Sequence, residues 1–228
     1  MKLLELFSGT GSVGKVARDK GYEVTSLDLK NADINIDILK WDYKVYDPGY
    51  FDIIWASPPC HTFSYLRRCN LWREGFTEER IQNDIDNIGL PILKRTEEII
   101  NYFEPLFYFI ENPKMGKMKD YIDRPFYDVD YCKYADWGYR KRTRIWTNLK
   151  GFIPKICKND CNSMEGNKHK INIGYHCFVV VEGETIQLGS KELRDKYCNN
   201  EKVKNKKLDV DLNQRYKIPP KLIEDLFS

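Results

Sequence analysis

The 228-residue sequence predicts an α/β fold, in which one large domain with an open, mostly parallel sheet precedes a small irregular C-terminal insert. Three features predict the sheet. An apolar run at 1–7 leads into a glycine-rich turn and a helical pattern at 13–20. A second strand pattern follows at 22–27. Two more apolar runs, at 51–56 and 106–110, end in motifs that contain proline, which stops a central strand.

The composition is that of an ordinary globular protein, with 42% hydrophobic and 31% charged residues. The net charge of +3 is too small to identify a polyanionic partner. No apolar run approaches the roughly 20 residues of a membrane span, and no secretion signal begins the sequence. We therefore expect no membrane partner and a cytoplasmic location, in the host cytoplasm if the chain is viral. There the seven cysteines are expected to be free, catalytic or metal-bound.

The turn Ser8-Gly9-Thr10-Gly11-Ser12 separates the first strand from the first helix, where glycines let the backbone approach a ligand. Asp28 ends the second strand about 20 residues later, where an acidic side chain commonly binds ribose hydroxyls. Together they predict a nucleotide-like cofactor. Asp37, in an extended segment at 31–41, is either a surface charge or an acceptor for an adenine amino group.

The loop Ser57-Pro58-Pro59-Cys60 follows the strand at 51–56. Two prolines stiffen this loop, so it would present Cys60 at the carboxyl end of a strand, where open α/β sheets bind ligands. The alternative is a buried cysteine after a proline turn.

A long helix is predicted over 77–103, with Thr77 as the N-cap and a kink at Pro91. The strand at 106–110 then ends in Glu111-Asn112-Pro113. Alone, Glu111 fits a cap or a structural carboxylate. With Cys60 on a neighbouring strand, the thiol and the carboxyl would face one crevice.

Two further strands, at 126–134 and 144–148, are predicted to pair antiparallel. The basic run Tyr139-Arg140-Lys141-Arg142-Thr143-Arg144 lies between them. It is either a solvated face or a site that orients a phosphate or a thiol, which suits the planar fork of arginine.

Four short motifs occur in a characteristic order: Phe7-Ser8-Gly9-Thr10-Gly11, Ser57-Pro58-Pro59-Cys60, Glu111-Asn112-Pro113 and Arg142-Thr143-Arg144. In this order they resemble the cytosine-C5 DNA methyltransferase family, which binds S-adenosylmethionine in a Rossmann-like fold. The resemblance implies a catalytic domain at 1–148, a small recognition or insert region at 149–212, and a C-terminal helix at 213–228 that returns to the catalytic domain. It implies a monomer that acts on double-stranded DNA with the target base flipped out.

The resemblance also implies residue roles. Cys60 would be the nucleophile and Glu111 its partner. Phe7, Gly9 and Gly11 would line the cofactor turn, and Asp28 would bind the ribose. Asp37 and Ile38 would contact the adenine, and Pro58 would pack beside the cofactor. Arg142 and Arg144 would support the thiolate and the flipped base. In this chemistry the Cys60 thiolate adds to cytosine C6. Glu111, with a pKa raised by burial, donates a proton or a hydrogen bond to ring N3. Arg142 is the predicted cation that holds the thiolate.

The chain departs from the family pattern at two sites. His61 follows the cysteine where the family has glutamine, and Arg140 replaces a glutamine before Arg142. His61 is not favoured as a base for Cys60, because adjacent side chains on an extended loop point apart. The loop at 62–72, with Arg67, Arg68 and Trp72, would instead clamp the DNA.

The segment at 151–207 is irregular and rich in lysine, asparagine and cysteine. Cys157, Cys161 and His169, with Cys177 and Cys198, would hold a structural zinc ion or remain free thiols. Strand patterns at 175–181 and 185–188 predict a hairpin, and the lysines would contact phosphates.

Three alternatives stay open. Amino-group methylation of adenine or N4 of cytosine would place an aromatic residue where Cys60 stands. An RNA cytosine methyltransferase is compatible with the short recognition region. The short recognition region is also compatible with a non-catalytic homologue that binds S-adenosylmethionine and DNA. The presence of Cys60 and Glu111 argues against this alternative.

Overall fold

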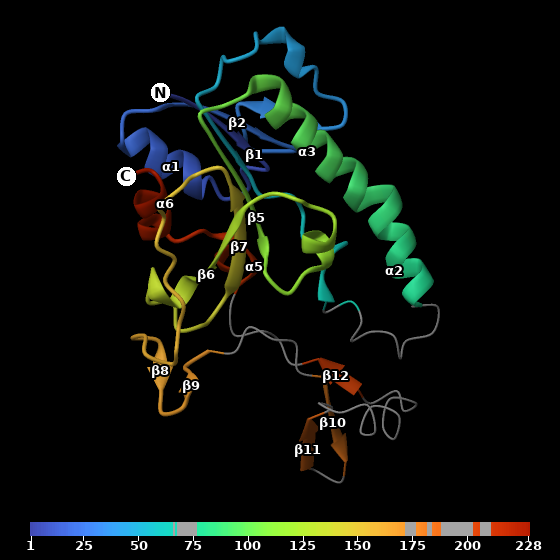
Figure 1. The fold of residues 1–228 in the computed structure, drawn as a ribbon. Helices are drawn as coiled ribbons and strands as arrows, with labels where there is room; N and C mark the ends of the chain where they lie inside the picture. Colours follow the sequence, from blue (N-terminus) through green and yellow to red (C-terminus); the bar gives the residue numbers. More distant parts are fainter. Residues whose placement is uncertain (66, 68–76, 172–176, 182–183, 188–202, 206–210) are drawn as a thin grey trace.

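The computed structural model describes residues 1–65, 67, 77–171, 177–181, 184–187, 203–205 and 211–228. Its main feature is a seven-stranded sheet with the order β3-β2-β1-β4-β5-β7-β6 (Figure 1). The strands are β1 (Lys2–Leu6), β2 (Glu23–Asp28), β3 (Ile34–Asn35), β4 (Ile53–Ala56), β5 (Phe107–Pro113), β6 (Phe126–Asp130) and β7 (Arg142–Thr147).

The sheet is doubly wound and Rossmann-like, as the sequence predicts. β1 pairs in parallel with β2 and β4, and β4 pairs in parallel with β5. The chain runs outward from β1 to β3 and then returns to β4 on the other side of β1. The winding therefore reverses between β1 and β4, and such sheets bind their ligands at the carboxyl ends of the strands at this reversal.

Helices cover both faces of the sheet. On one face, α1 (Ser12–Asp19) and α6 (Pro220–Leu226) lie side by side, whereas α2 (Glu78–Asp84) and α3 (Leu90–Phe103) cover the other face (Figure 1). Each layer has its own apolar core. Trp55 and Phe109 stack in the core beneath α1 and α6, with ring centroids 5.3 Å apart.

The long helix predicted over 77–103 forms with its predicted cap and interruption. The Thr77 hydroxyl accepts a hydrogen bond from the Arg80 N–H at 3.1 Å. A π-helical turn, η3 (Ile85–Gly89), separates α2 from α3. Pro91 lies in the first turn of α3, where its missing N–H costs little. The helical backbone continues through Pro91, and the π-helical turn just before it is the irregularity found near the predicted kink.

The strand boundaries differ from the sequence prediction most at the ends of β5 and β6. β5 continues through Glu111 to Pro113, because β7 pairs alongside it to the end. β6 pairs antiparallel with β7 as predicted but ends at Asp130, and η5 (Tyr131–Lys133) follows as a 3₁₀ turn. Two other 3₁₀ turns are η1 (Tyr43–Val45) and η4 (Lys117–Asp120).

The C-terminal third contains two small sheets. β8 (Met164–Glu165) pairs with β9 (Lys168–His169), and β10 (Cys177–Val181) lies between β11 (Glu184–Gln187) and β12 (Val203–Asn205). Antiparallel pairing of β10 with β11 confirms the predicted hairpin. Cys198, Arg68 and Trp72 lie outside the described residues.

α5 (Leu212–Tyr216) leads into α6, which is the predicted C-terminal helix. Leu222, Ile223 and Leu226 are buried in the core that also holds Val13 and Ala17 of α1. The domain boundaries at 148 and 213 remain predictions. Among the described helices, none is both long and apolar enough to cross a membrane.

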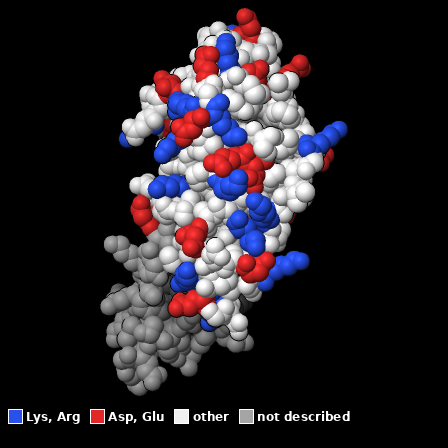
Figure 2. Space-filling view, turned by 90° about the vertical axis from the view of Figure 1, so that its left-hand side faces the viewer, with Lys and Arg blue, Asp and Glu red and all other residues white. Residues whose placement is uncertain are grey.

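The side of the molecule that carries α1 and α6 mixes charges of both signs (Figure 2). Lys155 and Lys221 both pair with Asp225, at 2.7 and 3.0 Å. The described part of this side therefore presents no uniform positive surface to a polyanion.

Candidate active site

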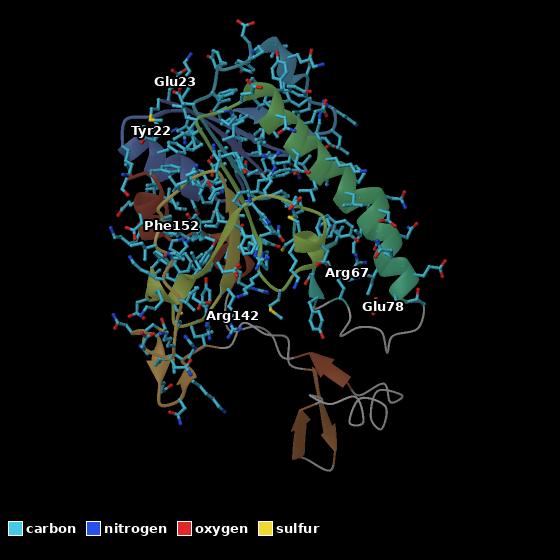
Figure 3. All side chains as sticks on the ribbon, viewed as in Figure 1. Tyr22, Glu23, Arg67, Glu78, Arg142 and Phe152 are labelled. Carbon is cyan, nitrogen blue, oxygen red and sulfur yellow. The ribbon has the colours of Figure 1, made fainter. Side chains whose placement is uncertain are left out.

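The sequence-predicted side chains gather at the carboxyl end of the parallel strands. In the strand register, Leu6 lies opposite Leu27 and Ala56, and Ala56 lies opposite Ile110. The residues that follow these positions therefore emerge along one edge. Figure 3 shows Arg67, Glu78 and Arg142 toward this end, and Tyr22 and Glu23, at the start of β2, at the opposite end. The small sheets β8–β9 and β10–β12 also lie at the carboxyl end of β5 (Figure 1).

The glycine turn after β1 has an unusual backbone. Gly9 and Gly11 have φ angles of 48° and 64°, and Phe7 has a φ of 59°. Glycine adopts this left-handed region freely, but a phenylalanine there is strained. Strain of this kind concentrates at ligand sites, so the turn is a strong candidate for binding.

Asp28 ends β2 beside this turn. Its Oδ2 accepts a hydrogen bond from the Gly9 N–H at 2.9 Å, and its Oδ1 accepts one from the Leu29 N–H at 2.6 Å. Each carboxylate oxygen has a second lone pair, which leaves acceptors for ribose hydroxyls. Leu29, which sequence reasoning missed, is 67% exposed and adds an apolar surface at this strand end. In the sequence, Leu29 could have been noticed as an apolar residue directly after Asp28, the acidic residue that ends β2.

Asp37 and Ile38 follow β3, whose Asn35 pairs with Asp28. The Asp37 Oδ1 accepts a hydrogen bond from the Leu39 N–H at 3.0 Å. Ile38 is only 3% exposed and belongs to the core. Asp37 is therefore available near the turn, whereas the Ile38 side chain offers little surface. Their roles toward an adenine remain predictions.

The loop that carries Cys60 is held from two sides. Thr62 and Phe63 are buried against the π turn. A Cβ at Gly89 would lie 2.6 Å from the Thr62 hydroxyl and 2.8 Å from the Phe63 ring, so only glycine permits this approach. The Lys117 N–H donates to the Phe63 carbonyl at 2.8 Å. Packing thus fixes the loop beyond what its prolines supply.

Cys60 and Glu111 come from adjacent strands, and the loops that carry them are joined. The Asn112 Nδ2 donates to the Pro58 carbonyl at 2.8 Å in a buried position. Burial raises the pKa of the Cys60 thiol, and the nearby Glu111 charge raises it further. An effect of this charge on the thiol requires the two groups to lie close together. The Asn112–Pro58 hydrogen bond between the two loops agrees with this proximity, and the region that follows β4 and β5 is called the crevice below.

Two cations oppose these effects. Lys141 and then Arg215 lower the pKa of the Cys60 thiol. The sequence predicts Arg142 for this position, but Arg142 is exposed at the start of β7. On balance the pKa of Cys60 is raised, which favours the neutral thiol in the absence of substrate.

Glu111 is held by two side chains that sequence reasoning missed. The Tyr131 hydroxyl donates to the Glu111 Oε1 at 2.9 Å, and the Lys141 Nζ lies 3.4 Å from the same oxygen. Burial and the Glu111 charge raise the pKa of Tyr131 well above its ordinary 10.0, so the phenol stays a donor. Lys141 lies inside the basic run that the sequence singled out. Nothing in the sequence marks Tyr131 as a partner of Glu111, because it reads only as one aromatic residue in a predicted strand.

Arg144 lies on the Asn112 side of the sheet, because these two residues are cross-strand partners. Its Nε donates to the Asp128 Oδ1 at 2.7 Å, and its Nη2 donates to the Asp128 Oδ2 at 3.0 Å. Its guanidinium also lies 3.6 Å from the Phe126 ring centroid. The predicted action of Arg142 and Arg144 on the thiolate and the base remains a prediction.

His61 and Arg67 flank the described end of the Cys60 loop. The His61 side chain is exposed, which agrees with its rejection as a base for Cys60. Arg67 pairs with Asp84 of α2. This ion pair ties the first part of the predicted clamp to the helix layer.

The predicted metal ligands Cys157, Cys161 and His169 also come together. A fourth residue, Cys132 from η5, joins them, and the four ligand atoms lie within 4.8 Å of one another. This cluster could hold a metal. Sequence reasoning missed Cys132 because it lies outside the irregular segment, inside a predicted strand.

Comparison with known proteins identifies relatives of this chain, although no protein-family model matches it. The chain is 50% identical over 172 residues to the "Probable DNA (cytosine-5)-methyltransferase" of Frog virus 3, covering 73% of this chain and 80% of that protein. Among solved structures, Entamoeba histolytica methyltransferase EhMeth matches 77% of this chain at 14% identity with a TM-score of 0.48. S. pombe Dnmt2 methyltransferase matches 87% at 14% identity with a TM-score of 0.39. This chain spans 58% and 66% of those two chains. By its identity to the viral relative over most of both sequences, the chain belongs to the cytosine-C5 DNA methyltransferase family.

Proposed function

We propose that this protein transfers a methyl group from S-adenosylmethionine to C5 of a cytosine flipped out of double-stranded DNA. The proposal is supported by the position of Cys60 and Glu111 after adjacent strands, in loops joined by the Asn112–Pro58 hydrogen bond, next to the strand that carries the strained glycine turn. A thiol and a carboxyl facing one base suit covalent activation of a pyrimidine.

Cys60 is the proposed nucleophile. Its sulfur bonds to C6 of the cytosine, and the electron pair of the C5–C6 bond then becomes available at C5. Because burial raises the pKa of the resting thiol, its proton must leave as the substrate binds. Lys141 and Arg215 supply positive charge that favours the thiolate at that stage. Later loss of the C5 proton and departure of the sulfur restore the enzyme.

Glu111, protonated on Oε2 for this step, is proposed to donate a hydrogen bond or its proton to ring N3, where electron density accumulates when the sulfur adds. Tyr131 and Lys141 contact its Oε1 at 2.9 and 3.4 Å, which leaves Oε2 for the base. In this arrangement Tyr131 is a positioning residue, since it acts on the substrate only through Glu111, whereas Lys141 also acts on the Cys60 thiol.

The residues at the carboxyl ends of β1 and β2 fit an adenosine cofactor. The strained Phe7, the glycine turn and the remaining acceptors of Asp28 form a set of apolar, backbone and carboxylate contacts. Asp37 follows β3, whose Asn35 pairs with Asp28, whereas Ile38 and Pro58 are buried. When bound, S-adenosylmethionine supplies the electrophilic methyl group that the activated C5 accepts.

DNA is the proposed partner at this end of the molecule. The small sheets of the C-terminal third lie at the carboxyl end of β5 (Figure 1). Lys158, Lys168 and Lys170, in and around β8 and β9, are exposed. Exposed lysines suit sequence-independent contacts with phosphates.

The test is mass spectrometry of nucleosides from DNA and from tRNA, each incubated with the protein and S-adenosylmethionine. We expect 5-methylcytosine in DNA, lost in Cys60→Ala and retained in His61→Ala, since the His61 side chain is exposed. N4-methylcytosine or N6-methyladenine would overturn the reaction class. Product in tRNA alone would move the substrate to RNA, and no product in either would favour a binding homologue.

A further inference from the structure

Four side chains that take no part in the proposed reaction converge below β6. The Cys₃His cluster consists of Cys132 in η5, Cys157 and Cys161 in the chain that follows β7, and His169 in β9. Asn159, with a φ of 64°, turns the chain between the two later cysteines. Three sulfur atoms and one ring nitrogen thus meet although the cluster draws on three separate segments.

We propose that the Cys₃His cluster binds one zinc ion as a closed, four-coordinate structural site. Zinc–sulfur and zinc–nitrogen bonds of about 2.3 and 2.0–2.1 Å at a tetrahedral angle place sulfur and nitrogen about 3.6 Å apart. The His169 Nε2 lies 3.6 Å from the Cys157 sulfur and 3.4 Å from the Cys161 sulfur. These spacings are those of the edges of one coordination tetrahedron.

Hydrogen bonding alone does not explain this arrangement. The His169 Nε2 faces two sulfur atoms, but an imidazole nitrogen either donates one proton or accepts one. A disulfide would use two of the sulfurs and leave the third and the imidazole without a role. One cation in the centre satisfies all four groups, and its binding releases the thiol protons.

The surroundings of the cluster orient its ligands. The Asp130 Oδ2 accepts hydrogen bonds from the Cys157 N–H at 2.8 Å and from the Arg140 Nη2 at 2.7 Å. The same Arg140 nitrogen donates to the Cys157 carbonyl at 2.9 Å. A zinc ion with three thiolates carries one net negative charge, and Arg140 and Lys133 place positive charge beside it. Hydrogen bonds from outside the ligand set are typical of real metal sites.

The segment at 151–171 also needs a cross-link. Its only regular structure is two strands of two residues each. Ile153 is 82% exposed and Ile156 is 43% exposed, so few apolar side chains fix the segment. A structural zinc ion contributes the folding free energy that such a small core lacks.

The site has a consequence for Glu111. Cys132 directly follows Tyr131, whose hydroxyl bonds to the Glu111 Oε1. Zinc would therefore fix the turn that holds a positioning residue, so metal loss would weaken catalysis through Tyr131 without touching Cys60. This consequence rests on the proposed function, but the zinc site itself does not.

Elemental analysis of the full-length protein, purified without added metal, tests the proposal. We expect one zinc ion per chain, and a loss of most of it in Cys161→Ser and in His169→Gln. Cys60→Ser is the matched cysteine control and should keep its zinc while losing activity. Asp130→Asn, which removes the buried charge that pairs with Arg140 and weakens the hydrogen bond to the Cys157 N–H, should weaken zinc binding by about 10–100-fold in a chelator competition.

A second measurement covers variants that fail to fold. Wild-type protein loaded with cobalt(II) should show the visible absorption of a tetrahedral ion and a thiolate charge-transfer band. Wild-type protein that carries no zinc and takes up neither metal would overturn the proposal. So would a native disulfide within the cluster, or folded Cys161→Ser protein with full zinc content. Any of these results leaves the test of methylation by Cys60 unaffected.

Discussion

The crevice around Cys60 and the Cys₃His cluster are built in opposite ways. The crevice groups leave adjacent parallel strands, and a buried ladder places Ala56 opposite Ile110. The cluster lies on a 3₁₀ turn, an irregular segment and one two-residue strand, with little apolar packing. The first region is positioned by burial, and the second by cross-linking. Reagents that attack burial or metal binding should therefore separate the two regions.

The largest expected effect is at the nucleophile. Cys60→Ala should lower the methylation rate by about 10⁴-fold or more, because the covalent route is lost. DNA containing 5-fluorocytosine should trap a covalent adduct with the wild-type protein in the presence of S-adenosylmethionine, because fluorine cannot leave as a proton does. Denaturing gel electrophoresis would detect the adduct.

The same substitution should leave the Cys₃His cluster intact, since Cys60 belongs to a different region. Zinc content and melting temperature should match those of the wild type. An adduct that persists in Cys60→Ala would remove Cys60 from its proposed role. A loss of zinc in this variant would contradict the separation of the regions.

Buried Glu5 should make the stability of the sheet region depend on pH. Its carboxyl accepts hydrogen bonds from the Val13 and Gly14 N–H groups, yet burial raises its pKa from 4.5 to about 7. Because the folded pKa lies above the unfolded value, this contribution to stability is complete below pH 4.5 and is lost as the pH rises through about 7. The loss is at most about 3 kcal/mol.

Denaturant unfolding at several pH values checks this dependence. The difference in unfolding free energy between wild type and Glu5→Gln should change across that range. Glu23→Gln, at an exposed position at the start of β2, is the matched control and should give a constant difference. Parallel curves for Glu5→Gln and the wild type would contradict the assignment.

The sequence indicates where β4 and β5 end because proline, which cannot continue a central strand, occurs at both ends. Pro58 and Pro113 mark two strand ends, and the period of apolar residues marks the strands themselves. The partners of Glu111 could not be predicted in this way. Tyr131 reaches Glu111 only because β6 gives way to a 3₁₀ turn, and that change has no local signal.

The basic run shows the same limit. Arg140 stands where the family has glutamine, and the structure gives it a role at Asp130 and Cys157 rather than in the crevice. Its neighbour Lys141 reaches Glu111 instead. A sequence shows that the run is cationic, but only the strand register decides which cation faces which side of the sheet.

Alkylation with iodoacetamide should separate the two sets of cysteines. Burial and Glu111 raise the pKa of Cys60 above its ordinary 9.0. Because thiolate is then scarce at neutral pH, the alkylation rate of Cys60 should rise about tenfold per pH unit below that pKa. Cys157 and Cys161, bound to zinc, should react only after a chelator is added. Peptide mass spectrometry measures each site, and pH-independent alkylation of Cys60 would place a resting thiolate there.

The smallest effect expected is at Tyr131. Tyr131→Phe removes the hydrogen bond to the Glu111 Oε1 and should cost about 1–2 kcal/mol in the chemical step, or about five- to thirty-fold in kcat. The KM for DNA should change little, because Tyr131 acts only through Glu111. Tyr43→Phe is the matched control, since the Tyr43 hydroxyl donates to the Glu98 Oε1 at 2.6 Å in the core on the other face of the sheet.

Both variants should lose some stability, but only Tyr131→Phe should slow adduct formation with 5-fluorocytosine DNA. Equal adduct rates in the two variants would reduce Tyr131 to a structural residue and would cut the link between the zinc-held turn and the crevice.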